Sequence, residues 1–202
     1  MNSDDRAPRI LGVAFLLQAF TLLVSGLILE VALIVPDDIS ETMIRIANHA
    51  WLLRANVFGE MITAAGVIFL GAVLFLTLRR QSEIMALVGL GFYILEATLL
   101  AASRISALSL LRISQEYSTV GHPIGLQAIG NMTLASMNSG YQLLMLPFCL
   151  GAILFYYLFY KSAIIPRALS LWGLAAVSLA MIGTVSEQSQ AIAKVGAFLY
   201  CV

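Results

Sequence analysis

Charged residues are scarce in this chain: Asp, Glu, Lys and Arg make up only 11% of its 202 residues, and the net charge is zero. Soluble domains are typically about 25% charged. A chain with so little charge has too few polar groups to cover the surface of a water-soluble fold. The balanced charge also excludes a strongly basic surface, so we expect no nucleic-acid partner.

Histidine and cysteine, the usual ligands of zinc, are equally rare. The chain holds two of each, and its cysteines lie far apart without metal-type spacing. A catalytic zinc takes three protein ligands, so a zinc site would have to combine His49 and His122 with an intramembrane carboxylate. The sequence contains no G-x-S-x-G elbow, P-loop or dinucleotide fingerprint. We therefore assign no catalytic residue, keep the two histidines as weak metal candidates, and leave the cofactor unspecified.

Apolar sequence, in contrast, is abundant: 60% of the residues are hydrophobic. They form runs of 18 or more residues, which are typical of membrane-spanning helices. The predicted fold class is all-α, a polytopic transmembrane helical bundle that forms one integral membrane domain. Breaks in hydrophobicity predict about six helices, at residues 10–35, 51–78, 84–111, 124 or 132–160, 168–185 and 191–202. The last run is too short to cross a membrane by itself.

Basic residues predict the orientation of these helices. With the N-terminus in the cytoplasm, six Lys and Arg residues lie inside and four outside, and Arg104 lies within a helix. The pair Arg79-Arg80 then faces the cytoplasm, and the polar segment 37–50, a candidate interfacial helix, faces outward. This distribution follows the positive-inside rule.

Three stretches of the sequence resemble one known family. They are GFYILEA at residues 91–97, SQEY at residues 114–117 and YYLFYKSAIIPRALSLWGL at residues 156–174. The chain resembles the bacterial membrane family catalogued as domain of unknown function 4386, from the first predicted helix to the fifth. This resemblance implies six helices in the bacterial inner (cytoplasmic) membrane and implies no activity. Members often carry an arginine at the position of Tyr93.

The third apolar run contains two charged residues, Glu96 and Arg104. Glu96 lies about 18 Å from the cytoplasmic start of its helix, near the middle of the membrane. Arg104 lies about 12 Å further outward, where we expect its long side chain to snorkel to the interface. A charge at the bilayer centre costs about 2.5–3.5 kcal/mol, so we expect Glu96 to be protonated or to face a partner inside the bundle.

Polar residues on neighbouring helices repeat at helical spacing. Asn56 and Glu60 share one face of the second predicted helix, and Tyr93 shares a face of the third with Glu96. The fourth predicted helix carries a stripe of amides, Gln127, Asn131, Asn138 and Gln142. Such residues are candidates for a polar cavity that opens outward, although amides in membrane helices also act as packing contacts. The candidates are Glu60, Glu96, Asn56, Arg104, Asn131, Asn138, Gln142 and Tyr93.

Three functions are compatible with this pattern. The first is a non-catalytic accessory subunit that packs in the bilayer against another membrane protein or against itself. The second is binding or transport of a small ligand, a lipid or an ion through the polar cavity, with Glu60 and Glu96 as proton or cation sites. The third is a membrane-embedded hydrolase. We expect the accessory subunit, because the sequence shows short loops and no recognisable reactive constellation.

Overall fold

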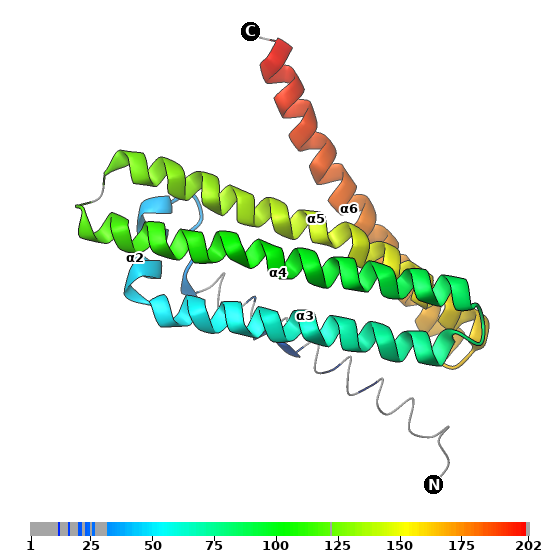
Figure 1. Ribbon diagram of the computed structural model, residues 1–202. Helices are drawn as coiled ribbons and strands as arrows, with labels where there is room; N and C mark the ends of the chain where they lie inside the picture. Colours follow the sequence, from blue (N-terminus) through cyan, green and yellow to red (C-terminus); the bar gives the residue numbers. More distant parts are fainter. Residues whose placement is uncertain are drawn as a thin grey trace. The chain divides into compact units, whose positions relative to one another are not determined.

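The computed structural model consists of helices and the turns that join them, within the residues that it describes. These are residues 12, 16, 20, 21, 23, 24 and 26, and the stretches 32–121 and 123–200, with only the backbone described after residue 186. Figure 1 shows the helices of this part of the chain: α2 (Ile39–Asn48), α3 (Ala50–Leu78), α4 (Glu83–Thr119), α5 (Ile124–Ser162) and α6 (Arg167–Tyr200). No strand occurs in these stretches, and the predicted all-α fold is confirmed for them.

Four helices of the described part are long and apolar enough to cross a membrane. They are α3, α4, α5 and the Arg167–Ser186 part of α6. Each contains a window of 18 residues in which charged side chains are few, the length that a hydrocarbon layer requires. The chain is therefore a polytopic helical membrane protein, as its apolar runs predict.

The short helix α2 has its own start signal. Asp37 adopts a positive φ of 61°, and the Asp38 carboxylate then caps the helix by accepting a hydrogen bond of 2.9 Å from the backbone N–H of Glu41. The buried side chains of α2 lie on one face: Thr42, Met43 and Ile46. The segment predicted as an interfacial helix is thus a capped amphipathic helix.

Turn residues separate the longer helices. α3 ends before the Arg79-Arg80 pair, and α4 ends before Gly121, whose φ of 83° is readily adopted only by glycine. Pro123 directly precedes α5 and Pro166 directly precedes α6. Proline is favoured at helix starts because its fixed φ suits the first turn and its missing N–H is not needed there.

The prediction of two separate helices at the end of the chain is wrong. Residues 168–185 and 191–202 were expected to form two helices, but the structure has one continuous helix, α6, from Arg167 to Tyr200. The residues between them, 186–190, are polar and contain neither proline nor glycine, so nothing in them interrupts the backbone hydrogen bonds. A drop in hydrophobicity here does not end the helix.

Other predicted boundaries are closer to the structure. α4 continues about two turns beyond residue 111 because its polar continuation also lacks a helix breaker. α5 begins at Ile124, the earlier of its two predicted starts. Most of the first predicted helix, residues 10–35, lies outside the described residues.

The helices are divided between two compact units. Unit 1 consists of Met1–Leu70 and Ala97–Tyr141, and unit 2 consists of Gly71–Glu96 and Gln142–Val202. The helices α3, α4 and α5 therefore contribute to both units, whereas α2 belongs to unit 1 and α6 to unit 2. The single membrane domain expected from the sequence stays a prediction.

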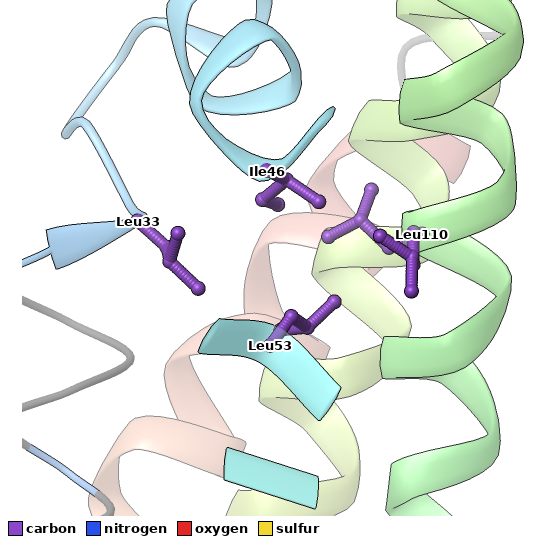
Figure 2. Close-up of a cluster of buried hydrophobic side chains, with 5 residues drawn as sticks. Leu33, Ile46, Leu53 and Leu110 are labelled. Carbon is purple, nitrogen blue, oxygen red and sulfur yellow. The ribbon is translucent and has the colours of Figure 1, made fainter. Parts of the chain in front are cut away.

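The core of unit 1 is a cluster of aliphatic side chains. Figure 2 shows Leu33, Ile46 of α2, Leu53 of α3 and Leu110 of α4 in this cluster. All four are almost completely buried. Because Ile46 belongs to it, α2 is part of the core of unit 1 and is more than a connection between spans.

The core of unit 2 depends on an aromatic pair and a close helix approach. Tyr93 of α4 and Phe155 of α5 meet edge to face, with ring centroids 5.1 Å apart and planes at 72°. A Cβ added at Gly151 would lie 2.7 Å from Cδ1 of Tyr93, so α5 has glycine where it passes this ring. Cys149 is fully buried against Val177 of α6, as a small core residue.

The helices α4 and α5 are longer than a bilayer is thick. With 37 and 39 residues they extend about 55 Å and about 58 Å, whereas a hydrocarbon layer measures about 30 Å. A tilt of about 40°, the upper end of the usual range, places only about 26 residues in the hydrocarbon. About ten residues of each helix therefore lie at or beyond a membrane surface.

Candidate functional site

Basic and aromatic residues of unit 2 mark one membrane boundary, which we call the basic end. Arg79 and Arg80 follow α3, Lys161 lies in the last turn of α5, and Arg167 begins α6. The guanidinium carbon of Arg167 lies 6.0 Å from the centroid of the Tyr160 ring. Basic residues and exposed tyrosines of this kind are typical of the headgroup region.

Three polar residues of unit 1 form one group: Glu60 of α3, Arg104 of α4 and Tyr141 of α5.

Arg104 is the central member of this group. Its side chain is 5% exposed, and Nε and Nη2 donate hydrogen bonds of 3.1 and 3.0 Å to the Ser103 hydroxyl. The guanidinium also interacts electrostatically with Glu60 of α3 and Tyr141 of α5. These neighbours keep the Arg104 side chain inside unit 1, and its expected position at the interface stays a prediction.

Glu60 and Asn56 lie one turn apart on α3. Asn56 is almost completely buried, and Glu60 is half-buried and interacts electrostatically with Arg104. Across from α4, a Cβ added at Gly140 of α5 would lie 3.0 Å from the Cβ of Ser103, so α4 and α5 approach closely beside this pair. Glu60 and Arg104 of the predicted set thus interact electrostatically within unit 1.

Asn131 and Asn138 of the predicted set lie elsewhere. Both side chains are exposed on α5, and neither has a hydrogen-bond partner among the residues that the structure describes. Gln142, the next member of the amide stripe, is half-buried and belongs to unit 2. The two asparagines are therefore part of the outer surface of unit 1 and not of its interior.

Glu96 and Tyr93 belong to unit 2, where they lie one turn apart on α4. Glu96 is 8% exposed, and its Oε2 atom is buried without a hydrogen-bond partner in the described part of the chain. Its carboxyl group interacts electrostatically with the Tyr93 hydroxyl and with the Cys149 thiol of α5. Tyr93, offered by the sequence as a ligand candidate, is a packed core residue.

The two histidines were the weak metal candidates of the sequence. His49 is exposed at the end of α2, where its Nδ1 lies 3.1 Å from the Arg45 carbonyl oxygen. His122 lies outside the described residues. Among the side chains that the structure describes, no three His, Cys, Asp or Glu residues are grouped so that they could hold a metal ion.

Sequence reasoning misses a polar network in unit 1. Tyr117 of α4 is fully buried, and its hydroxyl forms hydrogen bonds of 2.7 Å with the Ser40 hydroxyl of α2 and 2.6 Å with Nε2 of Gln127 on α5, which donates. The available signals were weak, since Tyr117 lies in the SQEY stretch and Gln127 in the amide stripe. Neither signal indicates that the two side chains meet.

Comparison with known protein families shows to which family the chain belongs. The model of the family described as Domain of unknown function (DUF4386) matches residues 10–201. The chain belongs to this family. No curated protein and no solved structure matches it. The DUF4386 match confirms the resemblance carried by residues 91–97, 114–117 and 156–174, which contain Glu96, Tyr117 and, from the basic end, Lys161 and Arg167.

Proposed function

We propose that this DUF4386 protein is a non-catalytic accessory subunit of the bacterial inner membrane, which packs through α5 against another membrane protein or a second copy of itself. The observation that carries the proposal is a row of exposed side chains on α5, which we call the α5 seam: Ile124, Ala128, Asn131, Ala135 and Asn138. These positions alternate in steps of four and three residues, which is the spacing of a helix–helix contact.

The chemistry of the α5 seam suits a second helix. Ala128 and Ala135 allow a close backbone approach, and the amides of Asn131 and Asn138 offer both hydrogen-bond donors and acceptors. Asparagine at a contact position fixes the register of two paired helices. Asn138 and Asn131 lie about 35 and about 45 Å from Lys161 along α5, so the partner helix must also reach the far membrane surface.

The finer membrane topology belongs to the same proposal. We place the N-terminus in the cytoplasm, residues 10–35 as a first span, and the helices α3 to α6 as four further spans. The basic end then faces the cytoplasm, as the positive-inside rule expects. The polar residues 186–190 of α6 lie about 30–35 Å from Arg167, which is where one crossing of the hydrocarbon ends. The described helices thus account for four spans, and the first predicted helix, residues 10–35, stays a prediction.

Native mass spectrometry of the protein, gently extracted from its own membrane, tests this proposal. We expect the wild type to carry another polypeptide or a second copy, and the double variant Asn131→Leu/Asn138→Leu to lose most of that complex because both amides are removed. The matched control, Ile129→Leu/Ser136→Leu, changes exposed residues on another side of α5 and should keep the complex. A wild-type protein that is monomeric in every mild detergent contradicts the proposal.

A second candidate function is the binding of a small ligand, a lipid or an ion at the Glu60–Arg104 pair. In its favour, the Arg104 guanidinium and the Glu60 carboxyl group interact electrostatically within unit 1. A guanidinium binds phosphate or carboxylate, and a carboxylate binds an ammonium group. In the same experiment this candidate predicts a lone protein with a reproducible small added mass, which Glu60→Gln removes.

A further inference from the structure

Glu96 is an ionisable group in surroundings that disfavour charge. It lies about 18 Å along α4 from Ile84, near the middle of a hydrocarbon layer about 30 Å thick. Its side chain is more than nine-tenths buried in unit 2. Its Oε2 atom has no hydrogen-bond partner in the part of the chain that the structure describes, although most buried polar atoms in proteins have one.

The groups that interact electrostatically with Glu96 are a phenol and a thiol. Tyr93 lies one turn before it on α4, and Cys149 belongs to α5. Arg104, the cation further along the same helix, interacts instead with residues of unit 1. Burial disfavours a negative charge on the Glu96 carboxyl group, and no cation among the described residues of unit 2 offsets this effect.

We propose that Glu96 is an intramembrane proton-binding site, which holds a proton as a neutral carboxylic acid and releases it only when water reaches Oε2. On release the O–H bond breaks, its electron pair stays on the carboxylate oxygen, and a water molecule takes the proton as hydronium. A neutral acid avoids the cost of a charge at the bilayer centre, which is about 2.5–3.5 kcal/mol or more. This inference does not depend on the α5 seam, because it concerns a different unit.

Infrared spectroscopy of the full-length protein in phosphatidylcholine vesicles tests the proposal. At neutral pH we expect the C=O stretching band of a protonated carboxylic acid, which disappears in Glu96→Gln. The matched control is Glu60→Gln, because Glu60 is also an intramembrane-helix carboxyl but has Arg104 as a neighbour, and this variant should keep the band. The absence of the band in the wild type, or its persistence in a folded Glu96→Gln protein, overturns the proposal.

Labelling of the wild type with a membrane-soluble carbodiimide gives a readout that does not depend on the folding of a variant. The carboxylic acid adds across the N=C=N group: its oxygen bonds to the central carbon, its proton moves to a nitrogen, and nothing leaves. The O-acylisourea then rearranges to a stable N-acylurea. Peptide mass spectrometry should find this adduct on Glu96, with little on the exposed Glu116. Labelling of other carboxyl groups without Glu96 contradicts the proposal.

Discussion

Unit 1 and unit 2 share three helices but present different surfaces. Along the spans of unit 2 most exposed side chains are apolar. The charged residues of unit 2 whose side chains the structure describes, apart from Glu96, lie at the basic end. Examples of the apolar surface are Leu76, Leu87, Leu95, Leu143, Leu169 and Leu179. In unit 1 the same helices also expose polar side chains, among them Arg54, Arg112, Gln115, Glu116, Asn131 and Asn138.

The difference shows that polar residues in one long apolar helix can lie in different environments. On α4 the carboxyl of Glu96 is buried in a unit whose surface suits lipid, whereas Glu116 on the same helix is exposed in the other unit. Because α4 is longer than the hydrocarbon is thick, one helix crosses from a lipid environment to a headgroup or aqueous environment. The position along the helix therefore decides what each polar side chain does.

Removing the buried cation of unit 1, Arg104, should have the largest effect on stability. Arg104→Met removes a buried cation that donates two hydrogen bonds to Ser103 and interacts electrostatically with Glu60, and we expect a loss of about 3 kcal/mol in the free energy of unfolding, since a hydrogen bond to a charged group contributes about 1.5–3 kcal/mol. Unfolding by SDS in mixed micelles measures this loss. The double variant Arg104→Met/Glu60→Gln should recover much of it. A double variant as unstable as Arg104→Met alone would show that the two charges do not stabilise each other.

Overpacking the helix contact of unit 2 should have the next largest effect. In Gly151→Val the added side chain meets the Tyr93 ring, and we expect a loss of about 2 kcal/mol, since forced repacking typically costs 1–3 kcal/mol. The control is Gly91→Val on α4, where nothing lies within 4 Å of the added Cβ. Equal destabilisation of the two variants would argue against a tight α4–α5 contact at Tyr93.

Loss of the Tyr117 network should have a smaller effect, confined to unit 1. Tyr117→Phe removes the hydroxyl that contacts Ser40 and Gln127 and leaves those groups to find other partners, for which we expect about 1–2 kcal/mol. Tyr157→Phe, a change of the same atom at an exposed tyrosine of unit 2, should shift stability by less than about 0.5 kcal/mol. The same SDS titration compares them, and equal shifts would mean that the network adds no stability.

The smallest expected effect is that of Glu96→Gln. A neutral acid and an amide have nearly the same shape, so we expect the free energy of unfolding to change by less than about 1 kcal/mol. This outcome separates Glu96 from Arg104, whose loss removes a charge that has a partner. A loss of 3 kcal/mol or more would instead indicate that the Glu96 carboxylate is paired.

The fold was largely predictable from the sequence, because long apolar runs between charged turns admit few structures. The end of α3 followed from the Arg79-Arg80 pair, and the start of α5 is the earlier of two starts that the sequence left open. The split of α6 was wrong because hydrophobicity reports where a helix leaves the hydrocarbon, whereas only proline, glycine or a cap reports where it ends.

The candidate site was predictable only in part. Helical spacing offered Glu60, Glu96 and Asn56 as candidates for a polar cavity. Their side chains are buried or half-buried in the structure, and the cavity stays a prediction. Helical spacing could not assign Arg104 to an inward position, because a long side chain at the membrane edge can turn either way. Nor could spacing separate the exposed Asn131 from the half-buried Gln127, since that depends on where α2 and α4 pack against α5.

The central claim is that the α5 seam is a contact surface, and photo-cross-linking in native membranes tests it most directly. A photoreactive amino acid is placed singly at each position from 124 to 139 of the full-length protein. We predict cross-linked complexes that are strongest at 128, 131, 135 and 138 and weak at 129 and 136, and the mass of the complex identifies a second copy or another protein. Cross-linking that is absent at all positions, or equal around the helix, would contradict the claim.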